Sequence, residues 1–286
     1  MEVRTIPPVP HAEFFPHPSH RRKRFRWLDR LAQDREELVR FWPVIHNMVV
    51  QELRVRYQRS FLGFVWTLLH PVLMMTILTL VFSHLIKKEN YAVYIFAGMV
   101  PWGFLSASLV DSTTSIIQNE SLIRKIYLPK LIFPLSKVLL NLSTFLLSMT
   151  SLFILLKPMG ARFSWALFAL PLVTALFFAF ALGLGLLVAT TNTFFRDCGH
   201  LVTVFLQAWY FATPIIYETT DLPEEVRWRL WLNPAFPFIH MYQMVLREGQ
   251  WPLWSTFSVA AGIAAASLGI GYAAFKSQED KLVFRL

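Results

Sequence analysis

The stretch Gln51–Pro71, QELRVRYQRSFLGFVWTLLHP, changes from a charged segment into a hydrophobic run without a break, as a chain entering a membrane does. Arg54 and Arg56 belong to the charged part, and Glu52 lies one helical turn before Arg56, so the two can pair. Apolar side chains recur at four-residue spacing on one helical face: Ile45, Val49, Leu53 and Tyr57. A basic flank before a span explains the arginines but not this stripe. The pattern therefore predicts an amphipathic helix over residues 41–62, lying in the membrane surface.

The composition is that of an all-α polytopic membrane protein. Of the 286 residues, 55% are hydrophobic and only 16% are charged, whereas soluble domains carry about 25% charged residues. The net charge of +9 does not predict a nucleic-acid partner, because 12 of the 27 Lys and Arg precede Gly63, where they suit an anionic membrane surface. The single cysteine, Cys198, permits no internal disulfide.

Six apolar stretches are long enough to span about 30 Å of hydrocarbon, which takes about 20 residues each. The fifth is short, and Pro214 near its end predicts that it breaks instead of crossing cleanly. The six predicted spans are Phe64–Ile86, Tyr91–Ile117, Leu131–Leu156, Phe163–Thr190, Leu201–Tyr217 and Leu253–Phe275. With the N-terminus inside, 20 Lys and Arg lie on the cytoplasmic side and 7 on the other. The positive-inside rule then places both termini in the cytoplasm.

The remaining parts of the chain follow from this arrangement. Residues 1–40 are expected to be a basic, Pro-rich cytosolic arm, whose run RRKRFRW favours anionic lipid or a partner subunit over nucleic acid. Residues 63–275 form the six-span transmembrane domain, and residues 276–286 form a cytosolic tail. Small residues at four-residue spacing predict close helix contacts in the fourth and sixth spans. These residues are Ala181, Gly185 and Ala189, and Ala261, Ala265 and Gly269.

The outer connection, residues 218–252, combines acidic groups with many large apolar ones, and prolines divide it into short helical pieces. A solvated loop does not need so many aromatic side chains. We therefore expect re-entrant helices that dip into the outer leaflet, with a surface loop as the alternative.

The cytoplasmic loop 118–133 predicts a docking element for another protein. Asn119 or Ser121 can cap a short helix there, and Pro129 stops it. This helix would expose an apolar surface ringed by charge, formed by Leu122, Ile123, Ile126 and Tyr127 beside Arg124 and Lys125. An ordinary loop helix would have a similar pattern.

Few residues have the chemistry of an active site. No Walker A loop, HExxH, GxSxG or CxxC motif is present, so no cofactor is expected on this chain. Asp111 is the one ionisable residue well inside a predicted span. It either faces substrate or protons, or makes a structural hydrogen bond across helices, or lies nearer the cytoplasmic interface than this span places it. Aromatic residues crowd the second and fifth spans, where they suit either a path for sugar rings or ordinary membrane interfaces and cores.

Five stretches carry a resemblance that spans residues 53–247 in matching order and spacing. They are RVRYQRSFLGFVWTLLHP (Arg54–Pro71), AGMVPWGFLSASL (Ala97–Leu109), NESLIRKIYLPKLIFPLSKV (Asn119–Val138), NTFFRDCGHL (Asn192–Leu201) and TPIIYETTDLPEEVRWRLWLNPAFPFI (Thr213–Ile239). In these the chain resembles the membrane permeases of ABC exporters for bacterial surface polysaccharides, such as O-antigen and capsule. The arm before Asp29 is not part of the resemblance.

The resemblance implies six spans, a homodimer, and a separate nucleotide-binding ATPase subunit that carries ATP and Mg²⁺ in a two-plus-two complex. It implies ATPase contacts at Arg54, Arg56, Tyr57, Glu120, Ser121, Leu122, Ile123, Arg124, Lys125, Tyr127, Arg196 and Asp197. It implies a substrate path lined by Phe64, Trp102, Phe104, Asp111, Phe205, Trp209, Tyr210 and Phe211. It implies an outer gate of re-entrant helices containing Trp228, Trp231, Phe236 and Phe238.

The sequence therefore predicts a non-enzymatic permease in the bacterial inner membrane, which exports a lipid-linked polysaccharide by means of ATP hydrolysis on a partner. Export of a teichoic acid or of a smaller lipid or drug by the same architecture is one alternative. A membrane enzyme of glycan assembly is the other, and Asp111 would be its only acidic candidate.

Overall fold

The computed structural model describes residues 27–58, 91–156, 164–282 and 285, with a few single positions between residues 65 and 80. The N-terminal arm before Trp27, Phe64 and most of the predicted first span lie outside the described residues. The chain divides at Arg40 into two units. The first unit contains α1 (Trp27–Arg40), and the second begins at Phe41 and contains the other described helices.

Four helices in the described part of the chain are long and apolar enough to cross a membrane. They are α4 (Tyr91–Thr114), α6 (Ile132–Leu156), α7 (Leu170–Phe194, preceded by the 3₁₀ turn Trp165–Ala169) and α11 (Trp254–Leu282). They coincide with the second, third, fourth and sixth predicted spans. Throughout the described ranges, all regular secondary structure is helical. The chain is therefore an integral membrane protein of the all-α class.

The fifth predicted span is shorter than a membrane crossing requires. Helix α8 (Cys198–Ala212) has 15 residues, which corresponds to about 22 Å of helix length. It ends two residues before Pro214, with Thr213 in an extended conformation, because a residue before proline is disfavoured in the helical region. This is the break that Pro214 predicts.

The last span is longer than predicted. Helix α11 continues past Phe275 to Leu282, so the expected cytosolic tail begins as helix. The segment KSQEDKL consists mainly of good helix formers, and Lys276 Nζ lies 2.6 Å from Glu279 Oε2 one turn later.

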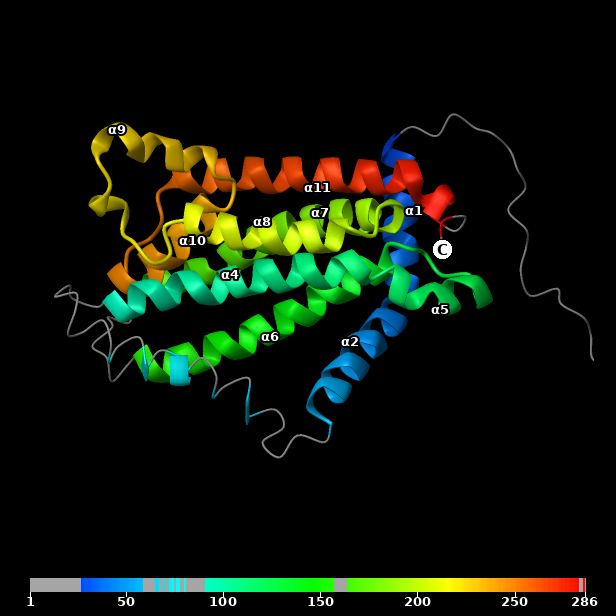
Figure 1. Cartoon of the computed structure of the whole chain (residues 1–286), viewed down its shortest axis with the longest axis horizontal. Helices are drawn as coiled ribbons and strands as arrows, with labels where there is room; N and C mark the ends of the chain where they lie inside the picture. The colour runs from blue at the N-terminus through cyan, green and yellow to red at the C-terminus, as the bar shows by residue number, and fades with distance from the viewer. Residues whose placement is uncertain are drawn as a thin grey trace, which may run out of the picture. The chain divides into compact units, whose positions relative to one another are not determined.

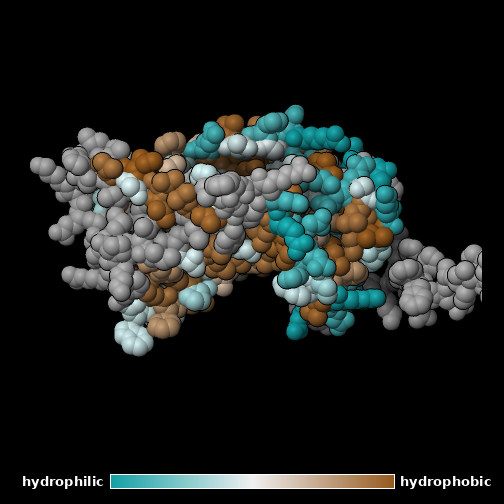
Figure 2. Space-filling view, turned by 90° about the horizontal axis from the view of Figure 1, so that it is seen from below, coloured by the Kyte–Doolittle hydropathy of each residue, from teal (hydrophilic) through white to brown (hydrophobic). Residues whose placement is uncertain are grey.

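The long helices pack side by side with α4 at the centre (Figure 1), and α4 contacts α6, α7, α8 and α10. Buried aromatic side chains fill the space between them, such as Phe104, Phe177 and Phe238. Hydrophobic side chains also extend over the outer surface of the bundle in the view of Figure 2, as the lipid-facing surface of a membrane protein requires.

Among the described glycines, those between α7 and α11 bring two helix backbones closest together. A Cβ atom on Gly183 would lie 2.3 Å from the Ser267 carbonyl carbon, and one on Gly271 would lie 2.0 Å from the Gly183 carbonyl oxygen. The predicted contact stripe of the sixth span is wrong, because Ala265 is exposed and Gly269 faces open space. The true contact is shifted to Ser267 and Gly271, on a neighbouring face of α11.

The predicted docking helix and the predicted outer gate lie at opposite ends of the bundle. The short helix α5 (Glu120–Lys125) follows α4 at one end, whereas α9 (Glu224–Arg227) and α10 (Phe236–Gln243) lie toward the other (Figure 1). Helix α2 (Trp42–Tyr57) contacts α6. Its residue Ile45 is fully buried, so at this position the apolar stripe packs against protein and not against acyl chains.

Candidate functional site

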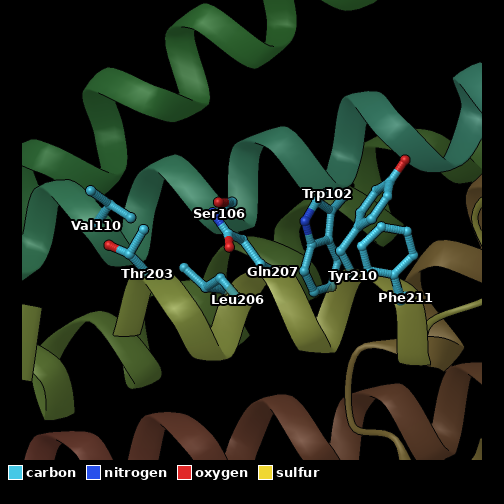
Figure 3. A pocket seen from close by; sticks show the side chains of 8 residues that line it. All are labelled: Trp102, Ser106, Val110, Thr203, Leu206, Gln207, Tyr210 and Phe211. Carbon is cyan, nitrogen blue, oxygen red and sulfur yellow. The ribbon is translucent and has the colours of Figure 1, made fainter. Parts of the chain in front are cut away.

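A groove of about 250 Å³ runs between α4 and α8 (Figure 3). Helix α4 contributes side chains at four-residue spacing, and α8 contributes side chains from the facing surface. The lining residues are Trp102, Ser106 and Val110 from α4, and Thr203, Leu206, Gln207, Tyr210 and Phe211 from α8. Because these α4 residues share one helical face, that face of α4 lines the groove from Trp102 to Val110.

One end of the groove is aromatic and the rest is mixed. The Trp102 ring lies 5.8 Å from the Tyr210 ring, and Tyr210 lies 5.4 Å from Phe211, centroid to centroid. Farther along, Ser106, Thr203 and Gln207 add hydroxyl and amide groups (Figure 3). Flat aromatic surfaces beside hydrogen-bonding groups suit sugar rings, which have apolar faces and hydroxyl edges. This arrangement can bind and guide such a ligand without changing a bond in it.

The structure separates the residues predicted to line a substrate path. Trp102, Tyr210 and Phe211 line the groove, and Trp209 packs behind them with its ring 5.6 Å from that of Trp102. Phe205 is exposed on α8, and its ring lies 5.3 Å from Trp209.

Two further residues predicted for the path lie elsewhere. Phe104 is buried in the core against Phe145 and Phe177, on a different face of α4 from the groove. Asp111 is not among the groove-lining residues.

Asp111 instead belongs to a cluster that we call the inner polar network, formed by Glu52, Arg56, Asp111, Lys137 and Asn141. The Asn141 Nδ2 atom donates to Asp111 Oδ2 at 2.8 Å, and an Arg56 guanidinium nitrogen lies 3.6 Å from the same oxygen. Lys137 Nζ lies 2.6 Å from Glu52 Oε1. Glu52 and Arg56 therefore each pair with a long helix, and the predicted pairing between them within α2 is not formed.

The predicted docking loop contains the expected helix, although it is shorter than predicted. Helix α5 ends at Lys125, and Ile126 is extended, so Ile126 and Tyr127 follow the helix instead of forming its last turn. Both are exposed, Tyr127 to 77%. Asn119 occupies the N-cap position of α5, but its side chain makes no capping hydrogen bond. Its side-chain amide donates to the Ser115 carbonyl at 2.8 Å.

Around that apolar pair, the other predicted docking residues are exposed or half-buried. Glu120 and Arg124 form an ion pair at 2.8 Å, and Ser121, Arg124 and Lys125 are exposed, while Leu122 and Ile123 are half-buried. On α2, Arg54 and Arg56 are exposed. The side chain of Tyr57 lies outside the described residues.

Arg196 and Asp197 lie in an exposed corner between α7 and α8. Asn192 holds this corner against α4, because its Nδ2 atom donates to the Thr113 carbonyl at 2.8 Å and its Oδ1 atom accepts from the Gly199 amide at 2.8 Å. The sequence interpretation missed Asn192 and Asn141. The signal for Asn141 is a lone amide in an apolar run, which must find a partner inside the bundle. The signal for Asn192 is an amide among threonines at the end of an apolar run.

The outer connection folds into short helical pieces, as its prolines predict: the 3₁₀ turns Thr219–Asp221 and Trp228–Leu232, helices α9 and α10, and the π-helical turn Met244–Glu248. The four predicted gate residues fall into two groups. Trp228 and Trp231 are exposed, whereas Phe236 and Phe238 are buried, and Phe238 stacks on Phe180 at 5.0 Å.

An ion pair joins the two ends of this outer connection. Arg247 lies 3.0 Å from Glu218 Oε1, and both side chains are largely buried. Burial raises the pKa of the neighbouring Glu248 carboxyl, Arg247 opposes that rise, and Glu218 adds to it. Among the residues described, no group of His, Cys, Asp and Glu is arranged to hold a metal ion.

Asn233 is a third residue that the sequence interpretation missed, although the dipeptide Asn-Pro is a turn signal. It accepts from Trp209 Nε1 at 2.7 Å and from the Ala235 amide at 3.0 Å, and it donates to Thr213 Oγ1 at 2.9 Å. It thus connects the outer connection to the end of α8.

We expect Asn233→Ala to lower the free energy of unfolding by about 2 kcal/mol, because the Trp209 indole N–H then loses its acceptor in a half-buried site. Thermal unfolding of the purified protein in detergent measures this loss. The matched control is Asn47→Ala, which removes an exposed amide on α2. Equal melting temperatures for the two variants would contradict the role of Asn233.

Comparisons with known proteins find similarity over most of the chain. The family model described as "ABC-2 type transporter" matches residues 44–246. The chain is 30% identical over 249 residues to the O-antigen export system permease protein RfbA of Myxococcus xanthus, covering 86% of this chain and 96% of that protein. It is 29% identical to a protein of the same name from Klebsiella pneumoniae over 203 residues, covering 70% and 78%. Polysialic acid transport protein KpsM of Escherichia coli is 19% identical over 244 residues, covering 84% and 95%.

Proposed function

This chain belongs to the ABC-2 type transporter family, and we propose that it is the membrane permease of an exporter that moves a lipid-linked surface polysaccharide out of the cytoplasm. It is a membrane transport subunit, and its work is mechanical. The relatives named for O-antigen export and polysialic acid transport support a polysaccharide as the substrate class.

The observation that carries this proposal is the groove between α4 and α8. An open groove suits a long polymer, because a chain can pass along it one sugar at a time. Trp102, Tyr210 and Phe211 offer faces for the rings, and Ser106 and Gln207 offer groups that exchange hydrogen bonds with successive hydroxyls. Such contacts tolerate different sugars, because every ring has an apolar face.

The energy comes from a separate nucleotide-binding subunit, which carries ATP and Mg²⁺. Its contact surface on this chain comprises α5 with Ile126 and Tyr127, the arginines of α2, and the Arg196–Asp197 corner. Ile126 and Tyr127 support this assignment, because an exposed apolar pair beside charged residues is the composition of a protein interface.

We infer that two copies of the chain and two ATPase subunits form the working complex. Helix α8 supports this, because it presents large exposed apolar side chains beside the open groove: Leu201, Val204, Phe205 and Phe211. A second copy that faces α8 would cover these side chains and close the groove into a channel.

The proposed topology has six spans in the bacterial inner membrane with both termini in the cytoplasm. It adds to the four long helices the predicted first span and a broken fifth span, in which α8 is followed by non-helical residues up to Tyr217. Helix α10 is the re-entrant element of the outer end, and its burial against α4, α7 and α11 supports this role, because irregular structure at membrane depth must be covered by protein.

The test is ATP-driven export in proteoliposomes that contain this chain, its partner ATPase and a lipid-linked glycan. We expect Tyr210→Ala with Phe211→Ala to lower the export rate about 30-fold, since each ring contributes about 1 kcal/mol of stacking. ATP hydrolysis should remain. The control is Trp165→Ala with Phe168→Ala, which removes an exposed aromatic pair of similar spacing, 5.7 Å, outside the groove.

Full export by the groove variant, or equal losses in both variants, would argue against a sugar path in this groove. The identity of the substrate needs a second readout. Mass spectrometry of the molecules that copurify with the complex distinguishes a glycan from a teichoic acid and from a smaller lipid or drug.

A further inference from the structure

The inner polar network joins α2 to two of the long helices at once. Glu52 on α2 pairs with Lys137 on α6, and Arg56 on α2 pairs with Asp111 on α4. Asn141 on α6 donates to Asp111 and so links α4 to α6 directly. The charges alternate in sign around this set, so each ion has a neighbour of opposite charge on another helix.

Because the network is partly buried, moving its helices apart costs free energy. The Lys137 side chain is only 10% exposed, and a buried ammonium group that loses its counter-charge is strongly destabilising. Asn141 is buried and uses both amide hydrogens, one toward Asp111 Oδ2 at 2.8 Å and one toward the Lys137 carbonyl at 3.0 Å. Moving α2 away from α6 would leave Lys137 buried without Glu52.

Apolar and weakly polar contacts hold the same face of α2. Ile45 is fully buried, and the Met48 sulfur lies 3.8 Å from the Ser136 hydroxyl of α6. Ile45, Met48 and Glu52 are three and four residues apart, so they lie along one face of α2. Helix α2 therefore has a fixed register against α6 over two helical turns.

The network also lies next to the groove. Asp111 follows Val110, which lines the groove at its inner end, and Ser106 and Trp102 line it farther along the same helix. A displacement of α2 that is transmitted through Asp111 would therefore reach the groove along α4.

We propose that Asp111 and Lys137 are positioning residues that fix α2 to α4 and α6, so that these three helices move as one body when the ATPase acts on α2. This inference rests on the proposed function for its energy source. It assigns Asp111 a role through Arg56 and Asn141, and not through contact with substrate or transported protons.

The first test needs neither ATPase nor glycan. In a Cys198→Ser background, Met48→Cys and Ser136→Cys place one thiol on each helix, and a short bifunctional thiol reagent joins them in membranes. We expect efficient cross-linking, with a yield that falls at least about tenfold when Glu52→Gln leaves the buried Lys137 ammonium group unpaired. The exchanged pair Glu52→Lys with Lys137→Glu should restore the yield, which separates charge pairing from a folding defect.

The matched control is Glu279→Gln, which breaks an ion pair of the same 2.6 Å length within the single helix α11. It should leave the yield unchanged. Cross-linking that is insensitive to Glu52→Gln, or that fails in the parent protein, would overturn the proposed attachment of α2.

The second test asks whether the three helices move together. The cross-linked protein, reconstituted with the ATPase, should export as much glycan per ATP as the same protein before cross-linking. A cross-link that forms but stops export would overturn the proposal, because α2 would then have to move relative to α6. If the protein exports nothing before cross-linking, the proposed function fails, while the cross-linking yield still decides whether α2 is fixed.

Discussion

Gly183→Val is expected to reduce the amount of folded protein in the membrane at least about tenfold, because overpacking of this kind costs about 3 kcal/mol. A Cβ atom at this position would lie within 2.5 Å of three backbone atoms of Ser267 and Leu268 on α11. Backbone atoms cannot turn aside as a flexible side chain can, so α7 and α11 would have to separate along their whole contact. The retained fraction in a mild-detergent solubilisation and size-exclusion assay measures the effect.

The control uses another glycine of the same bundle. A Cβ atom added to Gly262 on α11 would have no neighbouring atom within 4 Å, so Gly262→Val should accumulate as the parent protein does. If the two variants accumulate equally, the contact between α7 and α11 is not as close as described. If both are lost, the cause is the valine in a membrane helix and not the contact.

Ile126→Asp with Tyr127→Asp is the second large change, and it should abolish assembly with the ATPase. Both side chains are exposed after α5, so the chain should still fold and insert. Two charges in an apolar interface should weaken binding at least about tenfold each, which is typical of residues that dominate an interface. Pull-down of the ATPase from solubilised membranes, followed by ATP hydrolysis and export assays, measures the loss.

The conservative pair Ile126→Leu with Tyr127→Phe is the control at the same positions. It keeps the apolar surface, changes only the branching of one side chain and removes one hydroxyl, so assembly should be normal. An unchanged amount of complex with the aspartate pair would exclude this loop as a main contact. The main ATPase contact would then lie on α2 or at the corner that contains Arg196 and Asp197.

The long helices could be predicted from the sequence because each depends on its own composition. A run of about 20 apolar residues must satisfy its backbone within itself in lipid, so it forms a helix whatever surrounds it. The break at Pro214 and the short pieces of the outer connection could also be predicted from local sequence, because proline removes a backbone donor and restricts the preceding residue. The aromatic content of the groove was also visible, although not which aromatic residues would face it.

Which faces of the helices pack against each other could not be predicted from the sequence. Gly269 and Gly271 look alike in sequence, and only the rotation of α11 about its axis places Gly271 against Gly183. Phe104 and Trp102 are two residues apart, yet one fills the core and the other lines the groove. Such differences depend on which face of a helix its neighbours cover, and a nearly uniform apolar run contains little information about that.

Hydrophobic length, proline positions and specific local strings are therefore enough to establish the long membrane helices, the short helix α5 and the family of the protein. The surroundings of Asp111 depend on the packing of the folded chain. Its partners Arg56 and Asn141 are 55 and 30 residues away along the chain, and no local pattern relates them. A carboxylate inside a predicted span requires a partner, but which partner it finds depends on how α2, α4 and α6 pack together.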